Sequence, residues 1–193
     1  MLGQFLNNQP KAATLSALRA RLLADSPAQA LVSRHGRLLT LRHQRQQNAA
    51  DCLAACAAMM LGAVGHAIPY RRLLSLLEVG PTGASHRKLQ RLAAETPDIE
   101  VVHGQGRPAD LAISVDSGLP IALFVWTAEL PYWDVATRHA LVTVGYDETH
   151  YYVHDPALPN GPRRVRRGDL ELAWIAGDSY YTILTRATTA GDG

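Results

Sequence analysis

Cysteine and lysine are both scarce in this chain of 193 residues. The two cysteines, Cys52 and Cys56, are four residues apart, which places them on one face of a helix but suits a disulfide poorly. We therefore expect reduced thiols and a cytoplasmic setting. Lys11 and Lys88 are the only lysines, and the net charge is only +2, which is too small to predict a nucleic-acid partner.

Long hydrophobic runs and common cofactor motifs are missing as well. No apolar stretch reaches transmembrane length, and residues 1–11 lack a basic region followed by an apolar one, so we expect neither a transmembrane segment nor a secretory signal. The chain has no GxSxG, HExxH, phosphate loop or GxGxxG, and we expect no cofactor and no metal. Hydrophobic residues make up 47 % and charged residues 19 %, a composition typical of a globular protein.

Helical patterns occupy the first half of the sequence and strand patterns most of the second half. The expected helices cover residues 51–61, 70–77, a segment capped by Ser85 with Leu89, Leu92 and Ala93 inward, 111–115 and 170–173. The expected strands cover residues 99–102, 121–126, 139–146, 151–154 and 180–184. This segregation predicts an α+β fold in which an N-terminal helical part packs on an antiparallel β-sheet.

The sequence divides into three expected parts. Residues 1–37 form an N-terminal extension, in which Leu15, Leu18 and Leu22 predict a short amphipathic helix that packs on the domain. A pro-segment or a docking arm is the alternative for this extension. Residues 38–186 form one domain, which begins with an extended segment, and residues 187–193 form a disordered tail.

Cys52 stands where a polar loop becomes a helix rich in alanine, methionine and leucine, and Asp51 is the expected N-cap. A thiol at this position meets unpaired backbone N–H groups and the positive end of the helix dipole, and both favour the thiolate. Cys52 is therefore the candidate nucleophile. Cys56 lies one turn further into the apolar helix and fits the alternative reading, a small buried hydrophobic residue.

His139 and Asp155 follow Cys52 in the order of a cysteine–histidine–carboxylate site. His139 begins a nearly continuous apolar strand that would hold an imidazole rigidly, so it is the candidate base. Asp155 is the candidate orienting carboxylate, and a turn residue before proline is its alternative. Gln46 is a candidate oxyanion donor together with the Cys52 backbone N–H, although residues 44 and 47 are also glutamine and a surface side chain is the alternative.

These assignments set a condition on the pairing of two strands. An ordinary two-residue turn between them would put Asp155 opposite Val142, which points away from His139 because strand side chains alternate between faces. A bulge or an odd-length loop would shift the register by one residue and set Asp155 beside Leu141 or Thr143. The triad therefore predicts such an irregularity.

Together these motifs resemble the bacteriocin-processing, double-glycine leader peptidases, a papain-like cysteine peptidase family. The resemblance covers about residues 38–185 and rests on Gln46, Asp51-Cys52, Cys56, the segment from Gly118 to Ile121, the segment from His139 to Tyr146, and His154-Asp155-Pro156. It implies a papain-like cysteine peptidase fold. It also implies that Cys52 is the nucleophile, His139 the base, Asp155 the orienter and Gln46 the oxyanion donor.

The sequence departs from the family pattern at three points. Leu53 replaces the glycine that usually follows the catalytic cysteine, and we can name no family counterpart for residues 1–37. The family domain is often fused to an ABC transporter, and we find no membrane or ATPase segment in this sequence. The resemblance implies a stand-alone cysteine peptidase with a peptide or protein substrate, and more finely a leader peptide cut after small residues and a separate exporter. An acyltransferase or deamidase of the effector type and a non-catalytic peptide-binding domain are the alternatives.

Overall fold

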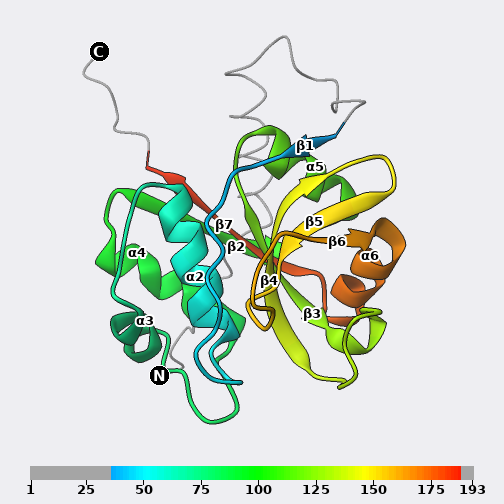
Figure 1. Cartoon of the computed structure of the whole chain (residues 1–193). Coiled ribbons are helices and arrows are strands. Elements are labelled where there is room, and N and C mark those ends of the chain that lie inside the picture. Colours follow the sequence, from blue (N-terminus) through cyan, green and yellow to red (C-terminus); the bar gives the residue numbers. More distant parts are fainter. Residues whose placement is uncertain (1–35, 188–193) are drawn as a thin grey trace, which may run out of the picture.

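A computed structural model describes residues 36–187, in which a seven-stranded antiparallel sheet lies between two groups of helices (Figure 1). The strands are β1 (Arg37–Leu38), β2 (Ile99–Gln105), β3 (Ile121–Trp126), β4 (Arg138–Tyr146), β5 (His150–His154), β6 (Arg163–Arg166) and β7 (Tyr180–Arg186). The α-helices are α2 (Cys52–Ala63), α3 (Tyr70–Leu76), α4 (Leu92–Glu95), α5 (Pro108–Asp116) and α6 (Arg167–Ala176). Two 3₁₀ helices, η1 (His86–Arg91) and η2 (Thr127–Glu129), complete the described elements.

The strand order is β2-β7-β3-β4-β5-β6, and β1 pairs with the end of β4. Helices α2, α3 and α4 lie on one face of the sheet, and α5 and α6 lie on the other (Figure 1). Both faces of the central strands are therefore buried, which explains why β3 and β4 are apolar at nearly every position. Along β3, Leu123 packs into the core shared with α5 and α6, whereas Ala122 and Phe124 pack against α2.

The β4–β5 hairpin contains the register shift that the expected Cys52–His139–Asp155 triad requires. Tyr146 pairs with Tyr151 across a two-residue turn, but one extra residue of β4, Val144, then interrupts the ladder. Beyond this bulge Val142 pairs with His154, so that Asp155 follows at the position opposite Leu141. A bulge changes which face the later residues occupy, because side chains alternate along a strand. The predicted shift by one residue is confirmed.

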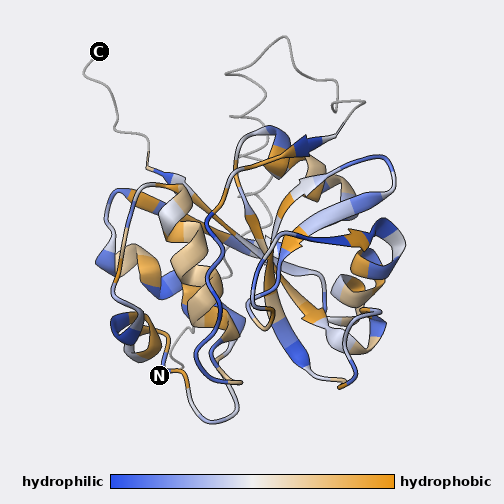
Figure 2. Cartoon of the chain, in the orientation of Figure 1, coloured by the Kyte–Doolittle hydropathy of each residue, from blue (hydrophilic) through white to orange (hydrophobic). Residues whose placement is uncertain are grey.

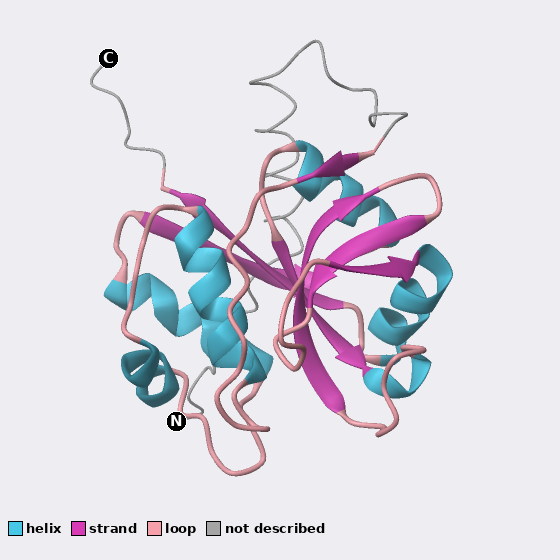
Figure 3. Cartoon of the chain, viewed as in Figure 1, coloured by secondary structure: helices cyan, strands magenta, loops and turns pink. Residues whose placement is uncertain are grey.

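A long segment without regular structure connects β1 to α2 and runs along the outside of the molecule beside α2 (Figure 3). It is mostly hydrophilic (Figure 2), which is consistent with its position at the surface. At its start, β1 crosses close to Gly145 of β4: a Cβ atom there would lie 2.6 Å from the Arg37 carbonyl oxygen. A glycine is required at this crossing because any side chain would collide with the backbone of β1.

Most of the predicted elements are present, and the differences are local. Leu89 and Leu92 are buried as expected, but Ala93 is exposed, and η1 begins at His86 without a side-chain cap from Ser85. Strand β6 was not predicted, because its arginines gave no strand pattern; only Val165 in it is buried. The expectations for residues 1–35, including the amphipathic helix, and for residues 188–193 lie outside the described residues. Within residues 36–187, no helix is long and apolar enough to cross a membrane.

Candidate active site

Cys52 is the first residue of α2, and its side chain is half-buried. Asp51 is the N-cap residue, but its carboxylate does not cap the helix. It accepts from the backbone and side-chain nitrogens of Asn48, at 3.1 and 3.0 Å, and so holds the preceding loop in shape. The Asp51 carboxylate therefore does not bind the backbone N–H groups at the start of α2, and these groups remain available beside the thiol.

His139 and Asp155 are in direct contact and both are buried. The Nε2 atom of His139 lies 2.8 Å from Oδ1 of Asp155, and the exposed fractions of the two residues are 6 % and 0 %. The same imidazole lies close enough to the Cys52 thiol for an interaction between them to shift both pKa values. Because Asp155 occupies Nε2, Nδ1 is the imidazole nitrogen left for the thiol. The structure thus brings Cys52, His139 and Asp155 together in one chain of contacts.

The charges of this chain of contacts reinforce one another. Burial alone would lower the pKa of His139, but hydrogen bonds to Asp155 and Cys52 and their negative charges raise it to about 9. Burial alone would raise the pKa of Cys52, yet the bond to His139, its charge and the backbone N–H groups of Ala140 and Leu53 lower it. These opposite shifts favour a thiolate–imidazolium pair.

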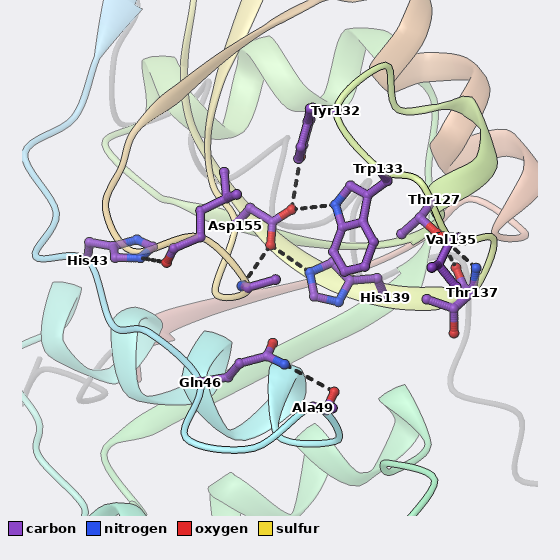
Figure 4. A network of polar contacts seen from close by, with 12 residues as sticks. His43, Gln46, Ala49, Thr127, Tyr132, Trp133, Val135, Thr137, His139 and Asp155 are labelled. Atoms are coloured by element: carbon purple, nitrogen blue, oxygen red, sulfur yellow. Dashed lines mark hydrogen bonds and ion pairs between the residues drawn. The ribbon is translucent and has the colours of Figure 1, made fainter.

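Asp155 accepts four hydrogen bonds, and three of them come from residues that the sequence did not single out. Oδ1 accepts from His139 and from the backbone N–H of Ala157 at 2.9 Å. Oδ2 accepts from the hydroxyl of Tyr132 at 3.0 Å and from the indole nitrogen of Trp133 at 2.9 Å (Figure 4). Burial opposes the charge, but the bond to His139, its charge and the donors from Trp133 and Ala157 lower the pKa of Asp155.

The loop before Cys52 is tied directly to the segment that carries Asp155. The backbone N–H of Gln46 donates to the carbonyl of Pro156 at 2.9 Å. His43 lies with its Nδ1 3.0 Å from Nδ1 of His154, and its Nε2 lies 3.0 Å from the carbonyl of Leu158. Because that carbonyl only accepts, Nε2 of His43 carries a proton. These contacts fix the loop before Cys52 against the end of β5.

The side chain of Gln46 points elsewhere in this structure. Its Nε2 donates to the carbonyls of Asn48 at 2.9 Å and Ala49 at 3.0 Å, which uses both amide protons. Figure 4 shows the amide turned toward Ala49 rather than toward His139. Gln46 therefore lies near the triad without contacting it, and its oxyanion role remains a prediction.

Cys56 differs from Cys52 in every respect that governs thiol reactivity. Its exposed fraction is 0 %, and it packs in the core between α2 and the sheet. Burial, followed by the charges of Cys52 and Asp155, raises the pKa of Cys56 well above its ordinary value. The prediction of a buried second cysteine is confirmed, and the direction of its pKa shift favours the protonated thiol.

Cys52 and His139 open onto a cleft of about 560 Å³. One wall is aromatic: the ring of His86 stacks on Tyr180 with centroids 4.3 Å apart and lies 4.9 Å from Phe124. Burial, then the charges of Arg87 and Arg138, lower the pKa of His86. The other lining residues include Leu53, Ala84, Ser85, Gln105, Val125, Ala140 and Asp178.

A helix that presents a cysteine to a histidine on an antiparallel sheet, backed by a buried aspartate, is the arrangement of the papain-like peptidases. The chain belongs to the peptidase C39 family, whose sequence model matches residues 40–186. The resemblance seen in the motifs is thereby confirmed. A search of curated protein sequences found no match.

Solved structures with this fold include several peptidases. A C39-like peptidase from Bacillus anthracis has a TM-score of 0.67 and 19 % identity, over 79 % of this chain and 99 % of that one. A double-glycine motif protease from an AMS/PCAT transporter, in complex with the leader peptide, has a TM-score of 0.61 and 17 % identity, over 78 % and 95 %. The peptidase domain of Streptococcus ComA, a bifunctional ABC transporter involved in a quorum-sensing pathway, has a TM-score of 0.60 and 15 % identity, over 76 % of this chain and 98 % of that one. At these identities the likeness establishes the fold alone.

Proposed function

We propose that this protein is a cysteine peptidase in which Cys52, His139 and Asp155 form the catalytic triad. The observation that carries the proposal is the chain of contacts from the thiol through the imidazole to a carboxylate that is completely buried. Membership of a peptidase family supports the same reaction.

The proposed reaction has two steps. The Cys52 thiolate attacks the scissile carbonyl to form a carbon–sulfur bond, and the imidazolium of His139 gives its proton to the departing amine as the carbon–nitrogen bond breaks. Water, activated by the now neutral imidazole, then hydrolyses the thioester to a carboxylic acid and restores the thiolate. Asp155 holds the imidazole and stabilises its positive charge throughout.

The developing oxyanion needs hydrogen-bond donors, and the start of α2 supplies backbone N–H groups, including that of Cys52. Gln46 is the further donor that we propose. To act, its amide would have to release one of the two carbonyls that it now binds, at positions 48 and 49. Substrate entry into the cleft would provide the occasion for that exchange.

We propose a peptide substrate cut after small residues, and specifically a leader peptide of the double-glycine type. The solved complex of a related fold with a leader peptide supports this substrate class. In that setting the protein would act in the cytoplasm beside a separate exporter. Leu53, in place of the family's glycine, follows Cys52 at the edge of the cleft, and its exposed fraction of 1 % places its side chain in the core between α2 and the sheet.

The proposal is tested by incubating the protein with a synthetic double-glycine leader peptide and weighing the products. We expect a gain of one water across the two fragments from the wild type, no turnover from Cys52→Ala, and full turnover from the matched control Cys56→Ala. A product joined to an added amine would indicate acyl transfer, and a gain of 1 Da in an uncut peptide would indicate deamidation. Equal turnover by Cys52→Ala and the wild type would refute the mechanism.

A further inference from the structure

The loop between β3 and β4, residues 127–137, reaches the triad from a side opposite to α2 (Figure 4). Its two ends are fastened together by Thr127, whose exposed fraction is 0 %. The Thr127 hydroxyl donates to the carbonyl of Val135 at 2.6 Å and accepts from the backbone N–H of Thr137 at 2.8 Å. A loop closed in this way holds its tip in one position.

The tip of this loop carries Tyr132 and Trp133, and both are half-buried. The indole ring of Trp133 lies against the imidazole of His139 with centroids 4.7 Å apart and a tilt of 52°. Its N–H reaches the carboxylate of Asp155 at the same time. The indole therefore meets Asp155 through its N–H edge and His139 through a tilted ring contact, while the side chain remains partly open to solvent.

Tyr132 secures this tip at its neighbouring position. Its hydroxyl donates to Asp155, and its ring is covered by the guanidinium of Arg163, 4.3 Å from the centroid. Burial, then the charge of Asp155 and the bond to it, raise the pKa of Tyr132. The hydroxyl thus stays a donor over the whole working pH range.

We infer that Trp133 is a positioning residue for the proposed reaction: its indole ring covers the His139–Asp155 pair, keeps water from it and so preserves the imidazolium that the thiolate needs. The inference rests on the proposed function. Its physical basis is that an ion pair is stronger where water is excluded. The charged and titratable groups that face this pair are Cys52 and, one turn further along α2, Cys56, together with Tyr132 from the same loop and Arg163 of β6 behind the tyrosine.

The test measures the alkylation of Cys52 by iodoacetate from pH 5 to 10, because this reaction needs no knowledge of the substrate. The anionic reagent is attracted by the imidazolium, so the rate of alkylation falls when His139 loses its proton, near pH 9 in the wild type. We call this high-pH fall the upper limb of the pH–rate profile. Trp133→Ala admits water, which relieves the burial that lowers the pKa of His139 but weakens its attraction to Asp155 and Cys52. We expect the weakened attraction to dominate, so the upper limb should move toward pH 6.5 by about one pH unit or more. Trp133→Phe keeps an aromatic cover and should keep the limb above pH 8.

Trp174→Phe is the matched control, because the Trp174 indole lies in the core and donates to the Tyr180 carbonyl at 2.7 Å. It should lower the stability and leave the limb in place. If Trp133→Ala does not fold, Trp133→Leu replaces it, with the same expected direction.

The inference would be overturned if the upper limb lay at the same pH in Trp133→Ala as in the wild type, or if Trp133→Phe moved it as far as Trp133→Ala does. A wild type in which Cys52 shows no upper limb would instead refute the proposed function, so the two failures are distinguishable.

Discussion

Replacement of Asp155 by asparagine is the change that most directly tests how the triad is held. The carboxylate accepts at both oxygens, from His139 and Ala157 on one and from Tyr132 and Trp133 on the other. An asparagine amide has one acceptor oxygen and one donor nitrogen. Whichever way it is turned, its NH₂ group faces an N–H donor, either Trp133 or the pair of His139 and Ala157. Asp155→Asn is therefore isosteric but not electrostatically silent.

The magnitude follows from the pKa of His139. The rise from 6.5 to about 9 corresponds to about 3 kcal/mol in favour of the imidazolium, at about 1.4 kcal/mol per pKa unit. Asp155 and Cys52 supply this stabilisation together, and asparagine removes the charge of the first. We expect the thiolate fraction at pH 6, and with it the rate of alkylation, to fall roughly 10- to 100-fold. Turnover should fall on the order of 10²- to 10⁴-fold.

The assay compares iodoacetamide alkylation at pH 6 for the wild type, Asp155→Asn and a matched control, Asp147→Asn. Asp147 lies in the same hairpin and is also a strongly hydrogen-bonded carboxylate, with Thr149, His150 and Tyr152 as donors. The control should lose some stability and keep the wild-type rate. If Asp155→Asn folded and reacted as fast as the wild type, the argument that Asp155 sustains the ion pair would be wrong.

Three further results are expected. Gln46→Ala should lower kcat by roughly 10²- to 10³-fold with little change in KM if the amide is one oxyanion donor, and an unchanged kcat would assign the role to the backbone alone. Cys56→Ser should stay active but lose about 1–3 kcal/mol of stability, because it buries a hydroxyl among apolar side chains without a hydrogen-bond partner; an inactive but folded variant would contradict this. The pKa of His139 is raised above its ordinary 6.5 in the folded protein, so its stabilising contribution is complete below pH 6.5 and is lost as the pH rises through about 9. In urea unfolding, the stability gap between the wild type and Asp155→Asn should therefore narrow between pH 6.5 and 9, and a constant gap would argue against it.

The sequence predicted well whatever depends on local pattern. The strand over 121–126 and the helix that starts at Cys52 have the expected bounds or nearly so, because apolar runs and loop-to-helix transitions are local signals. The register shift in the β4–β5 hairpin was also predictable, since Asp155 and His139 could share a face in no other way.

What the sequence did not predict depends on contacts between distant segments. The aromatic residues Tyr132 and Trp133 lie seven and six positions before His139, and nothing local distinguishes them from core residues. Their contacts with Asp155 arise only when the β3–β4 loop folds over the end of β5. Similarly, the Asp51 carboxylate was expected to cap α2 but binds Asn48, because the loop offers it closer donors.

The central claim, that Cys52 is the activated nucleophile, is tested most directly by brief alkylation of the native protein with iodoacetamide at mildly acidic pH, followed by peptide mapping. The low pKa of Cys52 and the raised pKa of the buried Cys56 predict that Cys52 alone is modified and that peptidase activity is lost in proportion. Labelling of Cys56 before Cys52, or full activity after Cys52 has been modified, would contradict the account.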